Sequence, residues 1–153
     1  MRHHRTHTPL LILLVLLCAV PSARKSLAAE NIAGPVAAEL IRVIDGDTVL
    51  VSATPWPDHH VTTYVRLRGI DAPELKSRCP AIRSAAEEAQ STLAHLLDAS
   101  PVVALANISG DKYYGRVVAA LILADGSDPA EALLSAGLVD PYRGGRKKSV
   151  ACP

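Results

Sequence analysis

The sequence lacks three features that each mark a different class of protein. It has no cluster of cysteine and histidine residues of the kind that binds zinc. It has no internal repeat and no long low-complexity tract, so its 153 residues are expected to form one domain. Its unbroken apolar run, residues 10–20, has 11 residues. A helix that spans a membrane needs about 20, so no spanning helix is predicted there.

The N-terminal residues have the pattern of an export signal. Arg2 and Arg5 precede the apolar run, and Ser26–Ala29 supplies the small residues that signal peptidase favours. We therefore predict a cleaved signal peptide over residues 1–28 and a periplasmic or extracellular location. The alternative is an uncleaved segment that anchors the protein to the membrane.

A large net positive charge is also missing. Four of the 16 Lys and Arg residues and none of the 15 Asp and Glu residues lie in residues 1–28, so the remaining chain carries a net charge of −3. No general positive field would steer such a chain toward nucleic acid. Any binding of a polyanion must come from local groups.

The cysteine count agrees with export. Cys18 leaves with the signal peptide, so Cys79 and Cys152 remain. An even pair in an exported protein predicts a disulfide. Two free thiols are the alternative.

The remaining chain divides into a linker at residues 29–38, a domain at 39–143 and a basic tail at 144–153. The domain holds five β-prone segments, which are residues 39–44, 48–53, 61–67, 102–108 and 117–123. Apolar residues at helical spacing predict a helix over residues 80–97, and a capping pattern starts a second short helix at residue 128. Three strands, a helix, two strands and a helix predict a mainly β (α+β) fold. We expect a five-stranded Greek-key barrel of the OB type.

Asp45-Gly46-Asp47 lies between the first two predicted strands. This is a strong hairpin signal, for which we expect Gly46 to supply a positive φ. Taken alone, these acidic residues need be nothing more than a turn. Asp71 and Glu74, spaced as in a capping box, also have a structural interpretation.

Arginines next to these acidic residues favour a chemical role. Arg66 and Arg68 lie on one side of the third predicted strand, and the pattern does not choose between them. Arg116 follows a glycine turn. Carboxylates suit a hard cation and guanidinium groups suit a phosphate, so the set is typical of metal-assisted cleavage of a phosphodiester.

The order of these motifs resembles the staphylococcal nuclease-like (thermonuclease) family. The motifs are V-I-D-G-D-T, V-R-L-R-G-I-D-A-P-E and D-K-Y-Y-G-R, followed by L-x-L-A-D-G and a helix that ends in A-G-L. The resemblance covers residues 40–142. It implies an OB-fold and a calcium-dependent nuclease that hydrolyses DNA and RNA with low sequence specificity, leaving 3′-phosphate and 5′-hydroxyl ends.

The resemblance also implies roles for individual residues. The calcium ligands would be Asp47, Asp71 and the backbone carbonyl of Ala72, with Asp45 close behind them. Glu74 would be the general base, and Arg66 and Arg116 would bind the phosphate. Further candidates for substrate contact are Lys112, Tyr114 (or its neighbour Tyr113) and Tyr142, with plain packing as the alternative. The turn before Arg116 is one tyrosine longer than the usual family pattern.

Two hypotheses follow from the sequence. The first is an exported nuclease that acts as a monomer, with Ca²⁺ as cofactor, nucleic acid as substrate and no stable protein partner. The alternative is a non-catalytic OB-fold module of the cell envelope that binds nucleic acid or a protein. The complete set of carboxylates and arginines favours the first.

Overall fold

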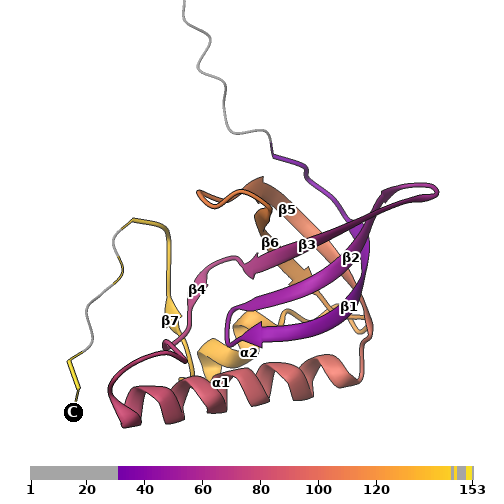
Figure 1. Ribbon diagram of the computed structural model, residues 1–153. Coiled ribbons are helices and arrows are strands. Elements are labelled where there is room, and N and C mark those ends of the chain that lie inside the picture. Colours follow the sequence, from indigo (N-terminus) through magenta and orange to yellow (C-terminus); the bar gives the residue numbers. More distant parts are fainter. Residues whose placement is uncertain (1–30, 146, 148–150, 153) are drawn as a thin grey trace, which may run out of the picture.

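The computed structural model describes residues 31–145, 147 and 151–152 (Figure 1). Five strands close into a barrel in the order β1-β2-β3-β6-β5. They are β1 (Val36–Asp45), β2 (Thr48–Trp56), β3 (His59–Leu67), β5 (Val102–Gly110) and β6 (Arg116–Ile122). The prediction of a five-stranded OB-type barrel is therefore confirmed.

Two helices and a small second sheet complete the fold. Helix α1 (Pro80–Asp98) connects the two halves of the barrel, and α2 (Pro129–Ser135) follows the last barrel strand. Strand β4 (Ile70–Asp71) pairs with β7 (Asp140–Pro141), which brings the end of the domain back beside the segment that leads into α1 (Figure 1). The sequence did not predict this pair, because two-residue strands carry no periodic pattern.

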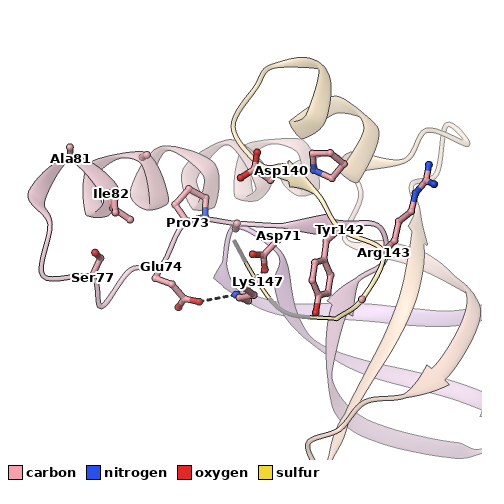
Figure 2. A pocket seen from close by; sticks show the side chains of 14 residues that line it. Asp71, Pro73, Glu74, Ser77, Ala81, Ile82, Asp140, Tyr142, Arg143 and Lys147 are labelled. Atoms are coloured by element: carbon pink, nitrogen blue, oxygen red, sulfur yellow. Dashed lines mark hydrogen bonds and ion pairs between the residues drawn. The ribbon is translucent and has the colours of Figure 1, made fainter. Parts of the chain in front are cut away.

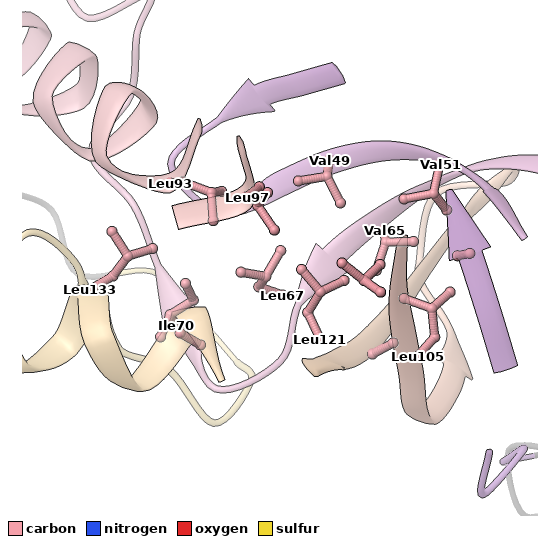
Figure 3. Packing of buried hydrophobic residues seen from close by; sticks show 14 of the residues in the cluster. Val49, Val51, Val65, Leu67, Ile70, Leu93, Leu97, Leu105, Leu121 and Leu133 are labelled. Atoms are coloured by element: carbon pink, nitrogen blue, oxygen red, sulfur yellow. The ribbon is translucent and has the colours of Figure 1, made fainter. Parts of the chain in front are cut away.

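The barrel is filled by aliphatic side chains, which tend to alternate along the strands with less buried positions, as the pleat of a strand predicts. Its largest fully buried residues are Val49, Val51, Val65, Leu67, Leu105 and Leu121. A second part of the same core lies where Leu93 and Leu97 of α1 meet Ile70 and Leu133 (Figure 3). Helix α1 therefore covers one end of the barrel, next to the start of β2.

The pairing of the barrel strands also fixes the position of Arg66. Strand β3 runs antiparallel to β2 with Thr48 opposite Arg66, and parallel to β6 with Arg66 opposite Val118. Arg66 thus lies between the β1–β2 turn and β6. Three segments distant in the sequence meet at this residue.

Several element boundaries differ from the expected ones. Strand β1 starts at Val36, and the buried Val36 and Ala38 pair with β5, so residues 36–38 belong to the barrel and not to a linker. Strand β2 extends beyond the expected residue 53 to Trp56, and β3 starts at His59 and not at residue 61. Only a tight turn at Pro57 and Asp58 separates the two strands. Asp58 in this turn has a φ of 61°. Aspartate tolerates this left-handed conformation better than most residues.

Gly46 has a different role from the one expected. Gly46 does not have a positive φ, so the hairpin does not need a left-handed residue there. A Cβ added at Gly46 would lie 2.7 Å from the Cβ of Ala89 on α1 and 2.9 Å from the Cβ of Ala72. The glycine is therefore required by the close approach of the β1–β2 turn to α1.

We expect Gly46→Ala to lower the free energy of unfolding by about 1–3 kcal/mol, since the added methyl group overpacks this contact. Urea denaturation measures the change. Gly110→Ala is the matched control, because a Cβ at Gly110 meets nothing within 4 Å. Equal stabilities for the two variants would show that the neighbours of Gly46 make room for a methyl group without a measurable loss of stability.

The described residues contain no helix that is both long and apolar enough to cross a membrane. The predicted signal peptide at residues 1–28 lies outside the described residues, as do parts of the basic tail.

Candidate active site

A groove of about 1040 Å³ runs across the ends of β1, β3 and β5, the start of β6 and the segment before α1. Most of the residues selected from the sequence line it: Asp45, Asp47, Arg66, Ala72, Glu74, Lys112, Arg116 and Tyr142. Asp71 is joined to Arg66 of this groove by an ion pair. Residues from both halves of the chain are thus brought to one site.

Asp47 is the most deeply buried charged group of the site, with 4% of its side chain exposed. Its Oδ2 accepts a hydrogen bond from the backbone N–H of Ala72 at 2.8 Å, and its Oδ1 accepts one from the Thr48 hydroxyl at 2.9 Å. Asp45 Oδ1 in turn accepts a hydrogen bond from the N–H of Asp47 at 3.0 Å, which fixes the turn. The carboxylate is held in one orientation.

Arg66 links this carboxylate to a second one. One guanidinium nitrogen lies 2.9 Å from Asp47 Oδ1, and the other lies 2.6 Å from Asp71 Oδ1. The guanidinium also lies over the ring of Tyr142, with its carbon 5.5 Å from the ring centre. Burial raises the pKa of Asp47, against the lowering effects of the Ala72 N–H and the charge of Arg66. The net shift is upward, so burial outweighs the nearby positive charge, which by itself favours the ionised form of the carboxyl group.

Arg68, the alternative to Arg66 in the sequence, has a structural role. Its guanidinium donates to the carbonyl of Asn107 at 2.6 Å, to the hydroxyl of Ser109 at 2.7 Å and to the carbonyl of Val118 at 3.0 Å. These bonds join β5 and β6 at the end of β3. The structure thus assigns the carboxylate contacts to Arg66.

Arg116 is held by the turn that precedes it. Its Nε lies 2.6 Å from Asp111 Oδ2, and its guanidinium lies over the ring of Tyr113, 4.7 Å from the ring centre. Tyr114, which was expected to contact substrate, is fully exposed and does not line the groove. The extra residue of this turn places Tyr113 in the groove instead. The two adjacent tyrosines could not be told apart from the sequence.

The contact with Arg116 predicts a pH dependence. Burial tends to raise the pKa of Asp111, but the hydrogen bonds from Arg116 and the Lys112 N–H, with the charge of Arg116, lower it below the ordinary 3.8. This stabilisation is present at neutral pH and is lost as the pH falls through the lowered pKa.

Asp111→Asn should therefore be less stable than wild type at pH 7. At a pH well below 3.8 the two proteins should be equally stable, as measured by thermal unfolding. Asp98→Asn, at the exposed end of α1, is the control. An undiminished difference in acid would contradict the assignment.

Lys147 is a site residue that the sequence did not single out. Its ammonium group lies 2.8 Å from Asp71 Oδ1 and 2.8 Å from Glu74 Oε1 (Figure 2). A disulfide joins Cys152 to Cys79 at the start of α1, with 5.6 Å between the Cα atoms. The disulfide returns the tail to the segment that carries Glu74. The pairing of the cysteines was the signal in the sequence that could have pointed to this lysine.

A calcium site was expected, and the donor set can be compared with that expectation. Within residues 31–145, 147 and 151–152, no group of three or more His, Cys, Asp or Glu side chains is arranged to hold a metal ion. Two carboxylates, Asp47 and Asp71, do converge on one positive charge, that of Arg66. All donors here are oxygens, which suits a hard cation that completes its shell with waters. The two carboxylates therefore fit a hard cation such as calcium in the chemistry of their donors.

Comparison with known proteins adds a family. A family model described as staphylococcal nuclease homologue matches residues 64–150, more than half of the chain. The matched region contains Arg66, Asp71, Glu74 and Arg116. None of the curated proteins compared with this chain matches it.

Proposed function

The chain belongs to the staphylococcal nuclease homologue family, and from this premise we propose that it is an exported, calcium-dependent nuclease. It hydrolyses phosphodiester bonds of DNA and RNA with low sequence specificity and leaves 3′-phosphate and 5′-hydroxyl ends. The observation that carries the proposal is the convergence of Asp47 and Asp71 on Arg66 in the same groove as Glu74 and Arg116.

The two arginines bind the phosphate. Arg66 and Arg116 both line the groove, and a guanidinium group matches two phosphate oxygens with parallel hydrogen bonds. Asp111 and Tyr113 hold Arg116, so it is oriented before substrate arrives. Both groups stabilise the extra negative charge that develops on the phosphate as water attacks.

Glu74 is the general base. Its carboxylate is 69% exposed and borders the groove, so a water molecule can reach it. It takes a proton from this water as the oxygen bonds to phosphorus. The bond from phosphorus to the 5′-oxygen breaks, that oxygen takes up a proton from solvent water to leave as a hydroxyl group, and Glu74 returns its proton to solvent.

Asp47, Asp71 and the carbonyl of Ala72 would hold the calcium ion. When bound, the ion supplies positive charge that stabilises the attacked phosphate. Asp47 is oriented for that role, because the backbone N–H of Ala72 and the hydroxyl of Thr48 hold its carboxylate.

Export and a monomeric state are parts of the same proposal. The disulfide between Cys79 and Cys152 supports an oxidising compartment, either the periplasm or the exterior of the cell. The mass of the protein recovered from cells shows where the chain begins and so tests export. A chain that begins near residue 29 supports cleavage, whereas an intact N-terminus in the membrane fraction supports the anchored alternative.

Digestion of single-stranded DNA by the purified protein tests the activity. We expect cleavage with Ca²⁺ and a loss of cleavage when EGTA is added, since the carboxylates then lack their ion. Raising the salt concentration should weaken substrate binding, because the contacts are to phosphates. Binding of the strand without any cleavage in Ca²⁺ would instead support the non-catalytic OB-fold module.

A further inference from the structure

The site contains a further cation, Lys147, that has no role in the mechanism above. Its ammonium group lies 2.8 Å from Asp71 Oδ1 and 2.8 Å from Glu74 Oε1 (Figure 2). The two contacts join a proposed calcium ligand to the proposed general base. Arg66 also pairs with Asp71 Oδ1, at 2.6 Å, so this one oxygen has two positive partners.

The chain holds Lys147 in place from both sides. Before it, the N–H of Tyr142 donates to the carbonyl of Gly69 at 2.7 Å, and the Tyr142 hydroxyl donates to the carbonyl of Gly145 at 2.7 Å. After it, Cys152 is joined by the disulfide to the start of α1. A lysine between two such anchors is confined near the carboxylates, so less conformational entropy is lost when the contact forms.

Two glycines make the bend that turns the tail back toward these carboxylates. Gly144 and Gly145 both have a φ of 91°, a left-handed conformation that residues with a side chain rarely adopt. A Cβ at either position would meet nothing within 4 Å, so glycine is needed for the backbone conformation and not for space. The local sequence thus favours the bend that brings Lys147 to the site.

The lysine side chain also has room to leave. A cavity of about 590 Å³ lies between the tail and the first turns of α1, and Lys147 lines both this cavity and the catalytic groove (Figure 2). The side chain is 43% exposed. An ammonium group that leaves the carboxylates therefore has open space to enter.

Resting on the proposed function, we propose that Lys147 is a built-in counter-ion that opposes calcium binding. It neutralises Asp71 and Glu74 in the calcium-free protein, and it must leave Asp71 when calcium binds. An ammonium group and a calcium ion both bind through the lone pairs of the same oxygen, and their positive charges repel each other. The tail, anchored by the disulfide, thus lowers the calcium affinity and raises the calcium concentration at which the nuclease becomes active.

Isothermal titration of the purified, substrate-free protein with calcium tests the inference. Lys147→Met keeps an apolar side chain of similar length but removes its charge. It should raise the calcium affinity by roughly 10-fold, the effect of one unit charge beside a doubly charged ion. Lys147→Arg keeps the charge and should bind calcium nearly as wild type does. Lys76→Met is the matched control, because Lys76 is exposed, lines the same groove and forms none of the ion pairs found in the described part of the chain.

The disulfide anchor is tested by a double substitution. Cys79→Ser/Cys152→Ser should raise the calcium affinity toward that of Lys147→Met. Adding Lys147→Met to this protein should then have little further effect, because changes that act on one contact are not additive. If circular dichroism shows that the serine protein is unfolded, Gly145→Ala takes its place, since alanine disfavours a φ of 91°. Fully additive effects would show that the anchor does not hold the lysine.

Cleavage of single-stranded DNA gives a second readout. The calcium concentration for half-maximal cleavage should fall in Lys147→Met by the same factor as the dissociation constant, while the rate at saturating calcium should match wild type. An unchanged calcium affinity with a lower maximal rate would overturn the inference and place the lysine on the substrate.

Failure of the inference is distinguishable from failure of the proposed function. Equal calcium affinities in wild type and Lys147→Met overturn the inference alone, because the protein then still binds calcium. If neither protein binds calcium, the proposed calcium-dependent function is wrong and the inference fails with it.

Discussion

Glu74→Gln should lower the cleavage rate by about 10²–10⁴-fold, the usual contribution of a general base. Glutamine keeps the shape of the side chain but cannot take a proton from the attacking water. The loss should appear in kcat, because the residue acts on water and does not hold the substrate. A time course of single-stranded DNA digestion at saturating substrate measures it.

Stability should hardly change in this variant. The Glu74 side chain is 69% exposed, and its bond to Lys147 is a surface ion pair, so the change in unfolding free energy should stay within about 0.5 kcal/mol. Glu87→Gln, at an exposed position of α1, is the matched control and should keep full activity. A Glu74→Gln protein that cleaves as fast as wild type would remove Glu74 from the mechanism.

Arg66→Met should reduce both stability and activity. It removes the positive partner of Asp47, whose side chain is 4% exposed, and of Asp71. An unpaired buried charge costs about 3–5 kcal/mol, and urea denaturation should show a loss of that size. The cleavage rate should fall by about 10²–10³-fold, as expected when one group that stabilises the transition state is lost.

The double variant Asp47→Asn/Arg66→Met separates the two effects. A neutral amide in place of the Asp47 carboxylate leaves no buried charge, and its oxygen can still accept a hydrogen bond from the N–H of Ala72. Part of the stability should therefore return, while activity should not. Arg42→Met, at an exposed position of β1, controls for the loss of an arginine. If the single Arg66 variant is as stable as Arg42→Met, the buried ion pair contributes nothing measurable.

Much of the barrel was predictable because its signals are local. Each strand carries its own alternation, α1 carries apolar residues at helical spacing after Pro80, and turn residues separate them. The site residues were predictable for a different reason. Their order along the chain, from Asp47 to Arg116, follows the motifs of a known family.

What the sequence could not predict depends on contacts between distant segments. Gly46 is needed because a Cβ placed there would lie 2.7 Å from Ala89 of α1, and a turn pattern contains no information about that helix. Lys147 reaches Glu74 only because β7 pairs with β4 and Cys152 bonds to Cys79. Tyr113 and Tyr114 are identical neighbours in the sequence, and only the conformation of the turn determines that Tyr113 lines the groove and Tyr114 does not. In each case the missing knowledge is a tertiary contact.

The disulfide has a further consequence for the integrity of the chain. Cys79 and Cys152 are 73 positions apart, so the bond closes a covalent ring that contains α1, β5, β6, α2 and β7. Exposed loop tips are preferred sites of proteolytic nicking, and the fully exposed Tyr114 lies at such a tip within the ring. A nick at that tip would leave both fragments covalently attached, with Arg116 still joined through the disulfide to the half that carries Glu74.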